Sequence, residues 1–322
     1  MQFPPFYTWF HPVLTALSAR VPLNLRLLAF QPIVLLSNTI TSYRYILNPL
    51  FTVHYAPSRD IHKIRYLLIF PPNYSPEGQR SYPLHIAFHS GGFLGGIPES
   101  TIPWLQHLSM TTNSIIVAGS YRFTPLHPFP AAVEDAEDLL LHLLEVAPSW
   151  AADINRITVS GFSAGGGLAL SMSLHEAAKG RIKAAVLFYS AIDMRKRRED
   201  KPRPEGMPKD PFAWIGPLID TYAPSPESEG YRDERLAPVD VEDIGRLPEK
   251  VLMVVAGRDI LVEENMRLKQ RLDDRAEMKV WGGRWHGWLE MPGMEKEQKE
   301  VFEGAAWWVE SVLSGERRVM GT

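Results

Sequence analysis

The 322-residue sequence predicts an α/β fold with a mostly parallel central sheet and helices on both faces. Short apolar runs alternate along the chain with stretches of helical periodicity, which is typical of strands joined by crossover helices. The apolar runs lack a regular alternation with polar residues, as expected for strands buried on both faces. Because such strands end at one common edge, we expect a functional site on the loops at that edge.

The strands and helices follow from these two patterns. Apolar runs rich in Val, Ile and Phe predict strands over residues 64–70, 83–89, 114–120, 156–160, 184–189 and 251–256, with 278–281 as a further candidate. Apolar residues at helical spacing predict helices over residues 131–146, 165–179, 263–272 and 297–313. A Pro/Asn/Ser/Gly-rich turn region separates the first two strands.

Two segments depart from this alternation and are predicted to form a lid over the core. The arm, residues 1–60, has no acidic residue before Asp60 and is rich in aromatic residues and proline. It is interpreted as part of a lid, with helices packed on the core or contact with a membrane surface as alternatives. The insert, residues 193–240, is rich in proline and carries the basic run 195–198, which a polyanion-binding patch would also show. Residues 61–192 and 241–322 then form the catalytic core.

Composition excludes several classes of function. The chain has no cysteine, which removes disulfides, thiolate catalysis and cysteine-ligated metal sites. Its ten histidines show no H-E-x-x-H pattern, so no metal or other cofactor is expected. The net charge of −3 gives no reason to expect nucleic-acid binding. The first basic residue is Arg20 and the apolar run 27–36 is short, so we expect neither a signal peptide nor a transmembrane helix, but a cytoplasmic protein that could form a homodimer.

The sequence G-F-S-A-G at residues 161–165 makes Ser163 a candidate nucleophile. It lies between a predicted strand and a helix that begins with small residues, the context of a nucleophile elbow, in which the serine is exposed on a sharp turn. The alternative is a glycine-rich turn that lets a helix pack closely on a sheet.

Two residues that lie much later in the chain could activate this serine. Asp259 follows the strand predicted at 251–256, and His286 follows the last candidate strand. An imidazole can accept the serine proton and return it, while a carboxylate orients the ring and stabilises its charged form. A surface histidine and an Asx turn or helix cap are the respective alternatives.

A glycine-rich loop could stabilise the oxyanion that forms when a carbonyl is attacked. His89-Ser-Gly-Gly-Phe93 leaves the strand predicted at 83–89. The backbone N–H groups of Gly91 and Gly92 could point toward the site beside that of Ala164, the residue after the candidate nucleophile. A plain glycine turn is the alternative.

Taken together, these motifs resemble those of the hormone-sensitive-lipase family of α/β-hydrolase esterases over residues 62–314. The family's H-G-G-G loop, its G-x-S-x-G elbow and its Y-R-x-x-P-x-H-P-F-P-A-A segment have counterparts at residues 89–92, 161–165 and 121–132, and D-x-L and H-G-aromatic motifs follow. The resemblance implies an α/β-hydrolase fold, a Ser163–Asp259–His286 triad, an oxyanion hole formed by Gly91, Gly92 and Ala164, and a structural ion pair between Arg122 and Asp135. The chain departs from the family pattern at Ser90 and Leu126, where glycine and glutamate are usual.

The expected reaction is hydrolysis of a small carboxylic ester through an acyl-enzyme, with a short acyl chain or an acetyl ester of an apolar alcohol as substrate. Phe93, Trp214 and Tyr222 are candidate walls of the substrate pocket. Acyl transfer, lactone cleavage or thioester release in a secondary-metabolite pathway would use the same residues. A noncatalytic binding protein of this fold is the remaining alternative, although such relatives typically lack the catalytic histidine.

Overall fold

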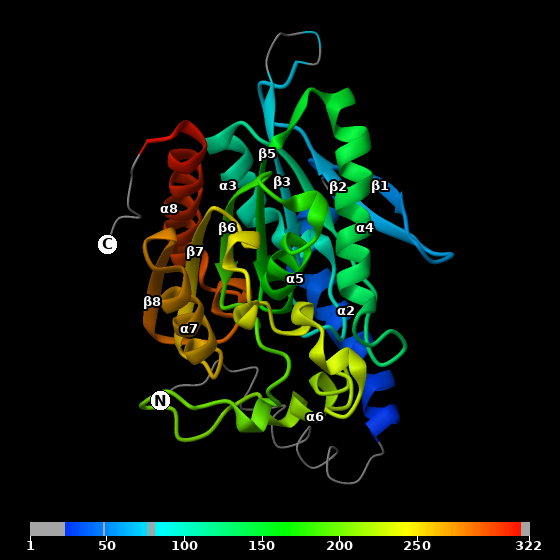
Figure 1. Cartoon of the computed structure of the whole chain (residues 1–322), viewed down its shortest axis with the longest axis vertical. Coiled ribbons are helices and arrows are strands. Elements are labelled where there is room, and N and C mark those ends of the chain that lie inside the picture. Colours follow the sequence, from blue (N-terminus) through cyan, green and yellow to red (C-terminus); the bar gives the residue numbers. More distant parts are fainter. Residues whose placement is uncertain (1–22, 48, 76, 78–80, 317–322) are drawn as a thin grey trace.

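An eight-stranded sheet forms the centre of the protein (Figure 1). The computed structural model describes all residues except 1–22, 48, 76, 78–80 and 317–322. The sheet order is β1-β2-β4-β3-β5-β6-β7-β8; β1 and β2 are antiparallel to their neighbours, and the pairs from β4 to β8 are parallel. The strands are β1 (Thr52–Pro57), β2 (Lys63–Ile69), β3 (Tyr82–Phe88), β4 (Ile115–Gly119), β5 (Ala152–Phe162), β6 (Ile182–Phe188), β7 (Lys250–Arg258) and β8 (Ala276–Trp285).

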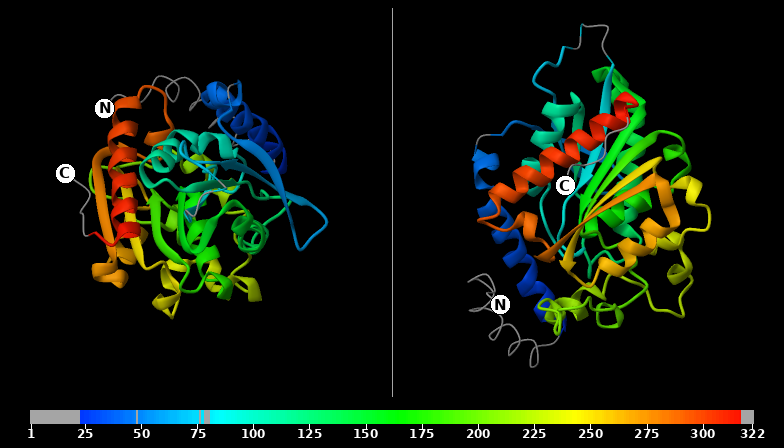
Figure 2. Two further views of the ribbon diagram at one scale, coloured as in Figure 1. Left: turned by 90° about the horizontal axis from the view of Figure 1, so that it is seen from above. Right: turned by 90° about the vertical axis from the view of Figure 1, so that its left-hand side faces the viewer.

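Helices cover both faces of the sheet, as the sequence predicts (Figures 1 and 2). The longer ones are α2 (Leu23–Leu47), α3 (Ile102–Thr112), α4 (Ala131–Val146), α5 (Ala164–Ser173), α7 (Val262–Leu272) and α8 (Glu295–Ser314). Successive residues of one strand belong to two different hydrophobic clusters: Val186 packs with α3 and α8, whereas Leu187 packs with α4, α5 and α7. This two-sided burial explains why the strands read as continuous apolar runs.

Three of the elements named above were not predicted as such. β1 lies inside the predicted arm and pairs with β2 as an edge strand. Its run is short and exposes Val53 and Tyr55, so it lacks the signal of a buried strand. No helix was predicted at α3. For the arm, in which α2 lies, helices packed on the core were considered only as an alternative to a lid. Residues 1–22 of the predicted arm lie outside the described residues.

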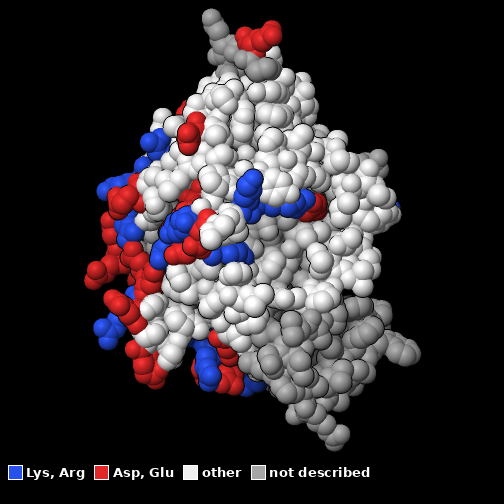
Figure 3. Space-filling model, turned by 90° about the vertical axis from the view of Figure 1, so that its right-hand side faces the viewer, with Lys and Arg blue, Asp and Glu red and all other residues white. Residues whose placement is uncertain are grey.

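Helix α2 contacts the core through one side and exposes several apolar side chains on the other. On its inner side, Gln31 Nε2 donates to the carbonyl of Thr124 at 3.1 Å, and Val34 lies 3.3 Å from the point where a β-carbon on Gly95 would stand. On its outer side, Leu36, Ile40 and Leu47 are largely exposed. On the face shown in Figure 3, charged side chains gather on one side and much of the remainder carries none. No helix in the described part of the chain has the length and apolar character needed to cross a bilayer.

The insert leaves the core and returns to it at almost the same place. The N–H of Met194 donates to the carbonyl of Leu236 at 3.0 Å, which closes the base of the segment. Between these points the chain forms short helical turns, among them α6 (Gly216–Ile219). A buried ion pair between Lys201 and Glu264 ties the insert to α7. Polar contacts of this kind make the insert an ordered layer on the core.

Because two histidines are buried in the core, we expect the protein to lose stability in mild acid. Burial lowers the pKa of His85 from 6.5 to about 3 and that of His89 to about 4. The unfolded chain therefore binds these protons at a higher pH than the folded chain does. Below about pH 6.5 the free energy of unfolding is expected to fall by about 1.4 kcal/mol per pH unit for each histidine, while above it these groups contribute no pH dependence.

Urea unfolding between about pH 7.5 and about pH 5 measures this slope. The His85→Asn protein should lose about half of it, because His89 remains. The ring nitrogens of His85 lie 2.7 Å from the hydroxyl of Thr158 and 2.8 Å from that of Ser160, and the amide of asparagine can also bond to hydroxyls. A wild-type stability that stays constant over this range would contradict the prediction.

Candidate active site

The predicted site residues meet at the carboxyl ends of the parallel strands. Ser163 follows β5, Asp259 follows β7, His286 follows β8, and the loop 89–93 follows β3. Ser163 adopts φ 52° and ψ −116°, a strained conformation for a residue with a side chain. A β-carbon on Gly165 would lie only 2.3 Å from the carbonyl oxygen of Phe88, so this position of the elbow requires glycine. The turn thus raises Ser163 between the sheet and α5.

Ser163, His286 and Asp259 form one continuous hydrogen-bonded chain. Ser163 Oγ lies 2.8 Å from His286 Nε2, and His286 Nδ1 lies 2.6 Å from Asp259 Oδ2. The second carboxylate oxygen, Oδ1, accepts the backbone N–H of Leu261 at 3.1 Å. Asp259 is buried, whereas the side chain of His286 is 19% exposed. The carboxylate is therefore held rigidly while the ring can reach a molecule bound from outside.

This arrangement can transfer a proton from the serine. With its Nδ1 hydrogen directed at Asp259, the ring presents an unprotonated Nε2 to the hydroxyl of Ser163. The ring becomes positively charged when it takes the proton, and the adjacent carboxylate stabilises that charge. The three side chains together can make Ser163 a nucleophile at neutral pH.

The glycine loop after β3 lies beside this chain in an unusual backbone conformation. Gly91, Gly92 and Phe93 all have positive φ angles, of 127°, 61° and 62°. Such a run turns successive N–H groups toward one side, a geometry suited to anions. Ala164 is the first residue of α5, where N–H groups have no partner within the helix. The loop and the helix start can therefore supply donors to an oxyanion.

A side chain at Gly91 should damage this loop. A β-carbon there would stand 1.8 Å from the carbonyl oxygen of Gly95, and the φ of 127° disfavours any other residue. We expect Gly91→Ala to lower kcat by about 10²- to 10³-fold, the cost of losing one oxyanion donor, in steady-state ester hydrolysis. Gly283→Ala is the matched control, because nothing lies within 4 Å of its added carbon. Equal activities of the two variants would rule out a role for the loop.

The candidate pocket residues Phe93, Trp214 and Tyr222 differ in their burial. Phe93 and Tyr222 are both buried and stack on each other with ring centroids 3.6 Å apart, and Trp214 lies half-buried in the short turn Ala213–Ile215. Whether these three contact a substrate stays a prediction. The structure brings two unpredicted residues of the insert to the site. The ring of Phe212 lies 6.1 Å from that of His286, and Ile219 lies 3.4 Å from the point where a β-carbon on Gly92 would stand.

Sequence reasoning also missed two polar residues near the histidine. Glu290 contacts both Ser90 and Tyr189, and the ring of Tyr189 lies 5.2 Å from that of His286. Burial raises the pKa of Glu290 above its usual value, and it raises that of Tyr189 well above 10. In the sequence, only Ser90 could have indicated this contact. It stands where the family pattern has glycine, and its hydroxyl needs a hydrogen-bond partner.

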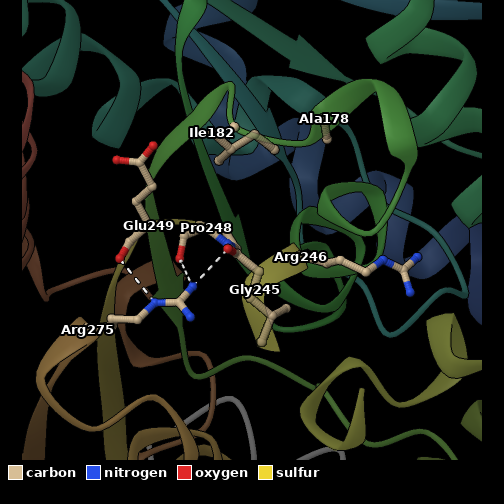
Figure 4. Close-up of a pocket in the computed structure, with 9 residues that line it drawn as sticks. Ala178, Ile182, Gly245, Arg246, Pro248, Glu249 and Arg275 are labelled. Carbon is tan, nitrogen blue, oxygen red and sulfur yellow. Dashed lines mark hydrogen bonds between the residues drawn. The ribbon is translucent and has the colours of Figure 1, made fainter. Parts of the chain in front are cut away.

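Other features of the structure lie away from this constellation. A pocket at the amino ends of β6 and β7 is lined by Ile182, Arg246 and neighbouring residues and contains none of the predicted site residues (Figure 4). There Arg275 donates to the carbonyls of Leu247 and Pro248, at 3.0 and 2.8 Å, so its guanidinium has a structural role. Within the described part of the chain, no three His, Asp or Glu side chains gather as metal ligands would.

Comparisons with known proteins give a consistent result. A family model described as alpha/beta hydrolase fold matches residues 85–290, more than half of the chain. Probable carboxylesterase 3 of Arabidopsis thaliana is 27% identical over 228 residues, which cover 67% of this chain and 68% of the plant protein. Esterase LipI of Mycobacterium tuberculosis is 28% identical over 214 residues, which cover 63% of each chain. An esterase of Pyrobaculum calidifontis has the same fold, with a TM-score of 0.71 at 23% identity over 96% of this chain and 99% of that chain.

Proposed function

Because the chain belongs to the hormone-sensitive-lipase-like branch of the alpha/beta hydrolase fold family, we propose that it is a serine esterase that hydrolyses carboxylic esters. The observation that carries this proposal is the hydrogen-bonded chain from Ser163 through His286 to Asp259. A glycine loop with positive φ angles lies next to it. The names of the relatives, carboxylesterase and esterase, agree with the same reaction.

The proposed reaction proceeds through an acyl-enzyme. Ser163 Oγ attacks the ester carbonyl carbon while its proton passes to His286 Nε2, and the carbonyl oxygen becomes an oxyanion held by the N–H groups of Gly91, Gly92 and Ala164. The bond from carbon to the alcohol oxygen then breaks, and the alcohol leaves with the proton from the ring. A water molecule that gives one proton to Nε2 of the same ring then attacks the acyl carbon. The bond from that carbon to Ser163 Oγ breaks, the acid leaves, and the ring returns the proton to Oγ.

We assign the substrate pocket to the insert and the arm, which together form the proposed lid. Phe212 and Ile219 of the insert lie against the histidine and the glycine loop, and Val34 of α2 packs against Gly95 at the end of that loop. The aromatic pair Phe93 and Tyr222 lies behind them in the core. Apolar walls this close to the nucleophile favour a small ester with an apolar alcohol and a short acyl chain.

Hydrolysis of p-nitrophenyl esters from acetate to long acyl chains tests the proposal. We expect kcat/KM to peak at short chains, and a burst of p-nitrophenol equal to the enzyme concentration if deacylation is the slower step. A p-nitrophenyl phosphonate should label Ser163 covalently, which peptide mass spectrometry can locate. If no ester is hydrolysed and Ser163 is not labelled, the protein is not a serine esterase.

A further inference from the structure

We propose that Ser90 and Glu290 form a clamp that positions the oxyanion loop against the histidine turn. The clamp deepens the proposed function and depends on it. Both residues are positioning residues: they act through the groups that they hold and do not touch the reacting atoms. The two residues are 200 positions apart in the sequence, and only the fold brings them together.

Three separate segments of the site converge on the carboxylate of Glu290. Its Oε1 accepts the hydroxyl hydrogen of Ser90, which belongs to the loop after β3. Its Oε2 accepts the hydroxyl hydrogen of Tyr189 at 3.0 Å, and Tyr189 follows β6. Glu290 itself ends the short turn Trp288–Glu290, which begins two residues after His286. One side chain therefore links the glycine loop, the end of β6 and the histidine turn.

On the histidine side, the clamp is part of a packed support for the ring. Tyr189 is fully buried, and its ring packs edge-on against the ring of His286 at 5.2 Å and tilted against that of Trp288 at 5.1 Å. The backbone N–H of Glu290 donates to the carbonyl of Gly287 at 2.9 Å, so the turn is short and stiff. A displacement of the Glu290 side chain would thus be transmitted to His286.

On the loop side, Ser90 is the residue immediately before Gly91. Its carbonyl oxygen lies 2.6 Å from Nδ1 of His89 and accepts the hydroxyl of Tyr121 at 3.3 Å. These two contacts hold the Ser90 backbone through residues of the core. The Ser90 side chain supplies a separate contact, to Glu290 of the histidine turn. With glycine at this position, the loop would have no side chain to reach Glu290.

The charge state of Glu290 depends on the groups that surround it. Titratable groups that face it are Tyr189, His286 and Tyr121. Burial raises the pKa of Glu290, while the hydrogen bonds from Ser90 and Tyr189 and the attraction of His286 lower it. The ionised carboxylate is the form that can accept both hydroxyl hydrogens.

A thermodynamic cycle tests the clamp. Wild type, Ser90→Ala, Glu290→Gln and the double variant are compared by kcat, KM and thermal unfolding on the best p-nitrophenyl ester, and by the rate of phosphonylation of Ser163. We expect each single variant to lose about tenfold or more in kcat with little change in KM, and the double variant to lose no more than the worse single one. Ser90→Thr, which keeps the hydroxyl, should retain most activity. Glu249→Gln, a surface pair with Lys183 remote from the site, is the matched control.

The outcomes separate this proposal from the one on which it rests. If wild type hydrolyses esters and Ser163→Ala does not, but the clamp variants keep wild-type kcat and lose only thermal stability, the clamp is overturned and the esterase stands. Additive losses in the double variant, or a Ser90→Thr protein as impaired as Ser90→Ala, also overturn it. If no ester is hydrolysed, the rate of phosphonylation of Ser163 still tests the clamp, because that reaction requires the same loop and histidine. Slower labelling of both single variants than of wild type supports the clamp, and rates equal to that of wild type overturn it.

Discussion

Replacing Ser163 with alanine is expected to lower kcat by about 10⁵- to 10⁶-fold while the fold stays intact. Alanine cannot attack the carbonyl carbon, so the reaction would depend on water alone. It fits the same strained backbone, with φ 52°, as well as serine does. Steady-state hydrolysis of the best p-nitrophenyl ester gives kcat, and thermal unfolding verifies the fold. Phosphonate labelling should disappear at the same time.

Ser160→Ala is a matched control for this variant. Ser160 is a buried serine three residues earlier, and its hydroxyl accepts Trp104 Nε1 at 2.9 Å and contacts His85 Nε2 at 2.8 Å. Its loss should lower the stability, because it leaves two buried nitrogens short of a partner, but kcat should stay within about tenfold of wild type. If Ser163→Ala retained activity similar to this control, Ser163 would not be the nucleophile.

The second large effect is expected for Asp259→Asn, with a loss of about 10⁴-fold in kcat. The amide of asparagine can present its NH₂ group to His286 Nδ1, which now accepts a hydrogen bond instead of donating one. The ring then carries its hydrogen on Nε2, the atom that lies 2.8 Å from Ser163 Oγ and should take the serine proton. The variant keeps the shape of the site and removes the base. KM should change little, because no substrate contact is lost.

A different buried carboxylate serves as the control for Asp259→Asn. Asp135 is equally buried and forms an ion pair with Arg122, at 3.0 Å, as the sequence predicts. Asp135→Asn should lower the melting temperature and leave kcat near that of wild type. Circular dichroism during heating and ester hydrolysis measure the two effects separately. A loss below about tenfold in Asp259→Asn would contradict the proposed orienting role.

Much of the fold was predictable because local signals agree with it. Seven of the eight strands and α4, α5, α7 and α8 are recognisable from apolar runs and helical spacing, since each buries a face that selects its residues. The predicted α/β-hydrolase fold is confirmed by the family match and by the solved relatives. β1 was missed because an exposed edge strand buries little and leaves a weak pattern. The helix α2 was obscured because Leu35, Leu36, Ile40 and Leu47 are exposed, so its apolar pattern does not mark a single buried face.

The sequence by itself determined which residue types stand at the ends of which strands. Ser163, Asp259 and His286 follow three parallel strands, and chain connectivity alone requires the ends of such strands to share an edge. What only the tertiary structure decided is how loops from distant parts of the chain meet there. The approach of Phe212 to His286, and the contact between Ser90 and Glu290, depend on side-chain packing between segments that no periodicity relates. Local patterns encode strands and turns, whereas contacts between loops arise from the sum of the packing around them.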